Sequence, residues 1–88
     1  MKSATYTITN KMGIHARPAA DLAKLVGKHK SDVTIATATK KANGKSVLML
    51  TTLGAKNGTE VTLTVSGEDE EEVFTQLDDM FKNHFYED

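Results

Sequence analysis

The 88-residue sequence contains no cysteine, no tryptophan and a single proline. Without cysteine the chain can form neither a disulfide framework nor a thiolate site for metal or redox chemistry. Its 11 Lys and Arg residues balance 12 Asp and Glu residues, so it lacks the basic surplus expected of a protein that binds nucleic acid or an anionic membrane surface. No apolar run approaches the roughly 18 residues of a membrane span, and the first residues lack the apolar core of a signal peptide. We therefore expect a cytoplasmic protein that neither binds nucleic acid nor inserts into a membrane.

The length bounds the architecture. A chain of 88 residues can build one small hydrophobic core but not two, so we expect one domain over residues 1–88. The three histidines, His15, His29 and His84, are too widely spaced to form a metal-binding pair on one helix. The sequence gives little reason to expect a metal ion or another cofactor.

Alternation of apolar residues with threonine or serine predicts three strands, at residues 4–9, 32–37 and 61–66. Apolar residues at helical spacing from Ala19 to Val26 predict a first helix of about ten residues that stops at Gly27. A last helix is predicted from Asp69 to about Phe85, and Asp69 with Glu72 resembles a capping box.

The segment between the second and last strands has two interpretations. Asn43 and Gly44 are a strong hairpin signal and would pair residues 33–42 with residues 45–51. The favoured alternative is a short third strand near Ala42, followed by a short helix that Ser46 caps and Gly54 ends. Strand, helix, strand, strand, helix, strand and helix then follow one another. This order predicts an α+β fold, an antiparallel sheet with helices on one face only.

His15 lies where the first helix begins. The first amides of a helix lack intrahelical acceptors, and with the helix dipole they form an anion site. The same helix end and the Arg17 guanidinium disfavour a further positive charge, so we expect a mostly neutral imidazole with a nucleophilic nitrogen. A phosphoryl group bound there would meet the amides of Ala16 and Arg17 and the guanidinium. The segment therefore suits phosphoryl transfer.

A histidine beside an arginine is more often an ordinary surface pair, because a short motif alone is weakly specific. Two neighbours argue against that alternative. Gly13 permits a positive φ in the approach turn, and Pro18 fixes φ in the first helical turn, where its missing N–H costs nothing. The sequence thus predicts a rigidly presented histidine.

The segment from Gly13 to Ala19, GIHARPA, resembles the active-site signature of HPr, the histidine-containing phosphocarrier of the bacterial phosphoenolpyruvate:sugar phosphotransferase system. A second segment, KSVL from Lys45 to Leu48 followed by Leu53 and Gly54, lies at the distance from the histidine that the family shows. Two matches at a fixed separation are far more specific than one, and the resemblance spans nearly the whole chain.

The resemblance implies an open-faced β-sandwich whose four-stranded antiparallel sheet has strand order 1-4-2-3, with three helices on one face. It implies that His15 accepts a phosphoryl group at Nδ1 from enzyme I, which phosphoenolpyruvate charges, and gives it to a sugar-specific enzyme IIA. Arg17 and the amide of Ala16 would hold the phosphate. The protein would be a phosphoryl carrier rather than a turnover enzyme.

The resemblance also implies that Val47 and Leu48, with Ala20 and Lys24 of the first helix, form the surface on which both partners dock. The alternative for Val47 and Leu48 is burial in the core, although single exposed aliphatic residues are common. Ser46 matches the serine that HPr kinase/phosphorylase modifies in many bacteria; a helix cap without regulation is equally compatible with the sequence. A phosphate there would place negative charge beside the docking surface. We expect a monomer.

Some positions depart from the best-known HPr pattern. Met12 stands where a small hydroxyl residue is common, and Met49 stands where some members have glycine. Residues 8–11 and the tail from Phe85 to Asp88 resemble the nitrogen-branch paralogue, whose output is regulatory, so the sequence leaves the branch open. His15 argues against the catabolite-repression paralogue, which has glutamine at this position.

A function of another class is a non-catalytic ferredoxin-like binding module, because such a fold also alternates strands and helices. Recognition of RNA would require a basic face and aromatic residues on the strands. Tyr6 is the only aromatic residue on a predicted strand. The sequence therefore disfavours this alternative.

Overall fold

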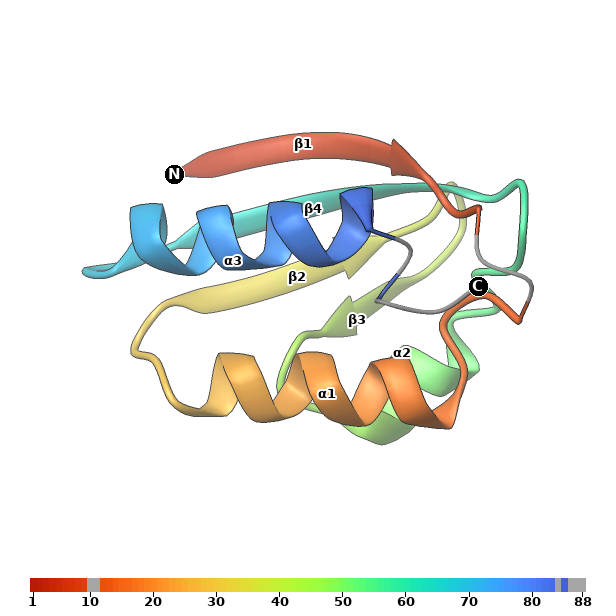
Figure 1. Cartoon of the computed structure of the whole chain (residues 1–88), viewed down its shortest axis with the longest axis horizontal. Helices are drawn as coiled ribbons and strands as arrows, with labels where there is room; N and C mark the ends of the chain where they lie inside the picture. The colour runs from red at the N-terminus through yellow and green to blue at the C-terminus, as the bar shows by residue number, and fades with distance from the viewer. Residues whose placement is uncertain (10–11, 84, 86–88) are drawn as a thin grey trace.

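The computed structural model describes residues 1–9, 12–83 and 85. Their elements follow the predicted order of strands and helices (Figure 1). In chain order they are β1 (Lys2–Thr7), α1 (Ala16–Gly27), β2 (Asp32–Ala36), β3 (Lys41–Asn43), α2 (Val47–Thr52), β4 (Glu60–Ser66) and α3 (Glu70–Lys82).

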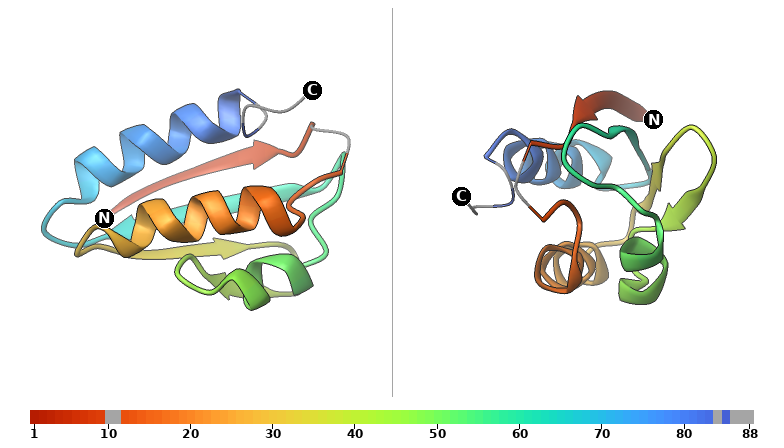
Figure 2. Two further views of the ribbon diagram at one scale, coloured as in Figure 1. Left: turned by 60° about the horizontal axis from the view of Figure 1, so that its bottom comes forward. Right: turned by 90° about the vertical axis from the view of Figure 1, so that its right-hand side faces the viewer.

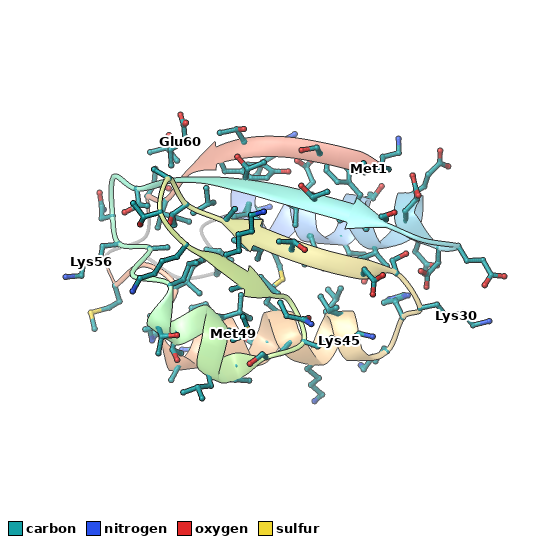
Figure 3. All side chains as sticks on the ribbon, turned by 180° about the vertical axis from the view of Figure 1, so that it is seen from behind. Met1, Lys30, Lys45, Met49, Lys56 and Glu60 are labelled. Carbon is teal, nitrogen blue, oxygen red and sulfur yellow. The ribbon has the colours of Figure 1, made fainter. Side chains whose placement is uncertain are left out.

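The strands form one antiparallel sheet in the order β1-β4-β2-β3. β4 therefore lies between β1 and β2, where Val61 faces Tyr6 and Leu63 faces Ile35. The helices cover one face of this sheet, as the end-on view in Figure 2 shows, and the other face carries no helix (Figure 3). The predicted open-faced α+β architecture and its strand order are confirmed.

Alternation along each strand divides the sheet into a core face and an open face. In β4, Val61, Leu63 and Val65 are fully buried beneath the helices, whereas the threonines between them are only half-buried. Leu22 of α1 and Leu77 of α3 are equally inaccessible on the facing side. Burying one such side chain contributes about 1.5–3 kcal/mol, so packing on the sheet, more than intrinsic propensity, holds these short helices.

α1 begins earlier than its apolar periodicity predicted. Its first residue is Ala16, and Pro18 is the third helical residue and is buried. The first turn has no apolar stripe of its own, so periodicity missed it, but the proline restricts φ to helical values there. At the other end the helix stops at Gly27 as predicted, although Gly27 does not adopt a positive φ.

The segment after β2 follows the helix interpretation, and the long hairpin from residue 33 to residue 51 is wrong. β3 ends at Asn43, and the Gly44 amide donates to Val33 O at 2.8 Å. Ser46 then caps α2, since its hydroxyl accepts from the amide of Met49 at 3.2 Å. Gly54 follows α2 with a φ of +77°, which is a common way to end a helix.

The capping box predicted for the last helix is also wrong. Asp69 is the residue before α3, but its carboxylate makes no capping bond. It accepts instead from the hydroxyl and amide of Ser31, from the Lys30 amide at 3.1 Å, and lies 3.0 Å from His29 Nδ1. These bonds, chiefly the one from the Ser31 hydroxyl, hold the pKa of Asp69 well below its ordinary value. Asp69 thus ties the loop after α1 to the start of α3.

α3 ends at Lys82, and Phe85 beyond it is buried against the core. The helix buries Val73, Leu77, Met80 and Phe81, which recur at helical spacing along it. His84, residues 86–88 of the acidic tail, and residues 10 and 11 lie outside the described residues.

Candidate functional site

The turn before His15 depends on a glycine. Gly13 has a φ of +68°, and a Cβ atom at this position would lie 2.2 Å from Ala55 O. Ile14 donates its amide to the same oxygen at 2.9 Å and buries its side chain. Only glycine fits both the backbone conformation and the close approach, so the predicted role of Gly13 is confirmed.

The loop between α2 and β4 braces this turn from the other side. Thr59 O accepts from the Ile8 amide at 2.8 Å, and Ile8 O accepts from the Gly58 amide at 2.7 Å. The Asn57 side chain adds a donor, with Nδ2 lying 3.1 Å from Thr9 O. Asn57 and Gly58 are a pair typical of turns, and local sequence gives no sign that they support the histidine's segment.

His15 is the N-cap residue of α1. Its backbone is extended, with φ −97° and ψ −170°, and its side chain makes no capping bond to the helix. His15 as a residue is partly exposed. Its carbonyl accepts the first α-helical bond, from the Ala19 amide at 3.0 Å. The imidazole therefore lies at the helix start but does not cap the helix.

Ala16 and Arg17 precede that first bond, so their amides have no acceptor within the helix. Both residues are exposed, whereas the next one, Pro18, has no N–H and is buried. Two backbone donors and a guanidinium therefore share the exposed start of α1 with His15. Such a helix end favours a bound anion.

Ala20 and Lys24 continue the exposed side of α1 that Arg17 begins. These residues fall at spacings of three and four, so they lie on one stripe of the helix surface. α2 packs beside α1 (Figure 2), and the chain leaving α2 reaches Ala55, which binds the turn before His15. α2 therefore lies next to the helix that carries the stripe, and Ala55 links the segment after α2 to the turn before His15.

α2 is apolar on its exposed side. Leu48 is 72% exposed and Val47 41%, whereas Leu50 is completely buried. Their predicted exposure is confirmed, and the alternative of burial in the core is wrong. Two further exposed apolar residues, Met12 and Met49, were not predicted as surface features.

The other described histidine lies at the opposite end of α1. His29 follows the helix, which has 12 residues and is about 18 Å long, and pairs with Asp69. Within residues 1–9, 12–83 and 85, no three potential ligands gather into a metal-binding cluster. In the same part of the chain, no helix has the length and apolarity needed to cross a membrane.

Residues 2–83 match the family model described as the PTS HPr component phosphorylation site. The chain belongs to the HPr family. The phosphocarrier protein HPr of Xylella fastidiosa (strain Temecula1) is 38% identical over 82 residues, which cover 93% of this chain and 92% of that protein.

Solved HPr structures share the whole architecture. The crystal structure of HPr-C-His from Thermoanaerobacter tengcongensis matches with a TM-score of 0.92 and 39% identity, covering 100% of this chain and 99% of that one. The crystal structure of an HPr dimer from the same organism matches with a TM-score of 0.74 and 39% identity, covering 97% of this chain and 98% of that one. As a member of the HPr family, the chain is a phosphocarrier of the phosphotransferase system rather than a turnover enzyme.

Proposed function

We propose that this HPr-family chain carries its phosphoryl group on Nδ1 of His15, receives it from phosphorylated enzyme I and gives it to a sugar-specific enzyme IIA. The observation that supports this most directly is the partly exposed His15 at the start of α1, followed by the exposed residues Ala16 and Arg17, whose amides have no acceptor within the helix. No other described histidine combines exposure with a helix start.

In the transfer step the lone pair of His15 Nδ1 forms a bond to phosphorus as the bond from phosphorus to the donor breaks. The phosphoryl oxygens then meet the amides of Ala16 and Arg17 and the Arg17 guanidinium, which offset their negative charge. Few donors hold the group, and they lie at an exposed helix end. This arrangement suits a relay, because a carrier that bound its phosphate too tightly would hold it back from the next protein.

The surface formed by Val47, Leu48, Ala20 and Lys24 is our proposed docking surface for both partners. It combines exposed aliphatic side chains with a positive rim, since Lys24 and Arg17 lie on the same stripe of α1. An apolar centre supplies contact area, and rim charges steer an acidic partner. Enzyme I and enzyme IIA would compete for this surface, so one must leave before the other binds.

Ser46 is our proposed regulatory site, with HPr kinase/phosphorylase as the modifying enzyme. Ser46 directly precedes Val47 and Leu48 in the chain. Phosphorylation of its hydroxyl would add a charge of about −1.5 to −2 at neutral pH. That charge would sit at the edge of the proposed docking surface and oppose an acidic partner. Treatment with this kinase and ATP, followed by peptide mapping, tests whether Ser46 is modified.

The proposed partners are cytoplasmic, and we place this chain in the same compartment and propose that it acts as a monomer. Sedimentation at the concentrations used for transfer assays tests the second statement. A monomer mass supports it, and a dimer mass would contradict it.

The proposal is tested by incubating the protein with enzyme I and phosphoenolpyruvate. Wild-type protein should gain one acid-labile phosphate, and His15→Ala should gain none, while the matched variant His29→Ala should be labelled normally. Labelling of His15→Ala would remove the assignment. Offering the phosphorylated protein in parallel to enzyme IIA of the sugar branch and of the nitrogen branch tests the branch, because the proposal predicts faster transfer to the former.

Arg17→Ala should slow transfer by about 10- to 100-fold, since it removes a charged donor to the phosphoryl oxygens. The urea midpoint should stay unchanged because Arg17 is exposed. Lys28→Ala removes the same charge just beyond the far end of α1 and is the matched control. Equal transfer rates for the two variants would contradict a specific role for Arg17.

A further inference from the structure

Met12 is an exposed thioether beside the proposed phosphorylation site. Apart from the N-terminal Met1 it is the most exposed methionine, at 66%, while Met49 is 44% and Met80 only 4% exposed. It directly precedes Gly13, whose backbone is fixed against Ala55. The Met12 side chain is therefore presented from an anchored backbone.

A protein whose interface is centred on His15 covers the position of Met12. Met12 is three positions before His15 in the chain, so their Cα atoms are at most about 11 Å apart. A standard protein interface buries about 800 Å² on each partner, which corresponds to a disc of about 16 Å radius. Met12 falls inside such a disc centred on His15.

Met49 lies in different surroundings. Its side chain lines a hollow with residues of β2 and β3, among them Thr34 and Asn43, and Figure 3 shows it at the side of α2 that adjoins β3. Met80 belongs to the core. The chain thus contains two internal references for Met12: Met49, which lines the hollow beside β2 and β3, and Met80, which is buried.

We propose that Met12 is an oxidation site at which hydrogen peroxide weakens docking of the phosphotransferase partners. The sulfur lone pair attacks one peroxide oxygen and the O–O bond breaks. The other oxygen takes up the proton of the transferred oxygen and leaves as water, which converts the thioether to a sulfoxide. The sulfoxide is polar, so covering it in an interface without a hydrogen-bond partner disfavours binding. This inference rests on the proposed function of His15.

The test treats the whole protein with hydrogen peroxide, maps methionine oxidation by mass spectrometry and measures transfer from phosphorylated enzyme I. Met12 should oxidise well before Met80. The KM of enzyme I for this protein should rise about fivefold or more, while kcat and the thermal midpoint stay unchanged. Peroxide should leave the KM of Met12→Leu unchanged and should raise that of Met49→Leu as much as that of wild type. Methionine sulfoxide reductase should restore the untreated KM.

An equal rise in KM for Met12→Leu and wild type after peroxide treatment would overturn the inference. An unchanged KM with Met12 fully oxidised would also overturn it. Untreated protein is assayed first: if it accepts no phosphate, the proposed function fails. Calorimetric binding of oxidised and reduced protein to enzyme I needs no transfer and decides the inference separately. Weaker binding of the oxidised form supports it, and equal or absent binding overturns it.

Discussion

Replacing Gly13 by alanine tests how firmly the turn before His15 is fixed. Its φ of +68° lies in the left-handed region, which costs an L-residue about 1–2 kcal/mol. The new Cβ would also lie 2.2 Å from Ala55 O and 2.7 Å from the Cα of Lys56. Because both are backbone atoms that cannot rotate away, relieving the overlap costs a further 1–3 kcal/mol or so.

The free energy of unfolding should therefore fall by about 2–5 kcal/mol, a large share of the roughly 5–15 kcal/mol that stabilises a typical small domain. Gly54→Ala is the matched control. Gly54 has a similar φ of +77°, but no heavy atom lies within 4 Å of a Cβ placed there, so this variant should lose only the backbone contribution of about 1–2 kcal/mol. Gly27→Ala, at the last residue of α1 with open space around it, should raise the free energy of unfolding by up to about 1 kcal/mol.

Urea unfolding at pH 7, followed by far-ultraviolet circular dichroism, gives the three free energies by linear extrapolation. The expected order of stability is Gly27→Ala, wild type, Gly54→Ala and Gly13→Ala. At urea concentrations where it is folded, Gly13→Ala should also transfer phosphate more slowly than Gly54→Ala, since it displaces the histidine's own turn. If Gly13→Ala were no less stable than Gly54→Ala, the close approach to Ala55 would not constrain the turn as described.

Two further predictions concern stability. Ser46→Ala should lower the free energy of unfolding by about 1 kcal/mol, because it removes the acceptor for the Met49 amide, whereas Ser46→Asp should retain most of the cap; equal urea midpoints for all three proteins would contradict the cap. Asp69→Asn should be destabilised near neutral pH, since bonds led by that from the Ser31 hydroxyl depress the pKa of Asp69 in the folded state. Because the pKa of Asp69 is lower in the folded than in the unfolded protein, its ionised carboxylate stabilises the fold above about pH 4. This contribution disappears as the pH falls through the folded-state pKa. The difference in free energy of unfolding between wild type and Asp69→Asn should therefore decrease between pH 5 and pH 2. A difference that stayed constant would contradict the assignment.

The sheet and the faces of its strands were predictable because alternation is a local signal. In β4 each apolar residue that alternates with threonine is buried, and in α3 the helical period selects the buried residues correctly. The motif at the start of α1 was recognisable for the same reason, since His15, Ala16 and Arg17 are consecutive. Chemistry carried by neighbouring residues can be derived before the fold is known.

Long-range contacts escaped prediction. Gly44 looked like a hairpin glycine, yet a Cβ there would lie 2.8 Å from Val33 Cβ, so it permits a close approach to another strand. Asp69 looked like a helix cap, yet its carboxylate binds a loop 38 residues away. Ala55 and Asn57 support the histidine's segment from across more than 40 residues of chain. In each case the local sequence indicated a turn or cap residue but could not identify the distant residue that it contacts.

The most direct test of the account is to locate the phosphoryl group on the intact protein. Protein with 15N-labelled histidine, phosphorylated by enzyme I and phosphoenolpyruvate, is examined by phosphorus and nitrogen NMR. The account predicts one new phosphorus signal coupled to Nδ1 of His15, with the ring signals of His29 unchanged. Coupling to another histidine or to Nε2, or a phosphorus signal from a serine or threonine oxygen, would contradict it.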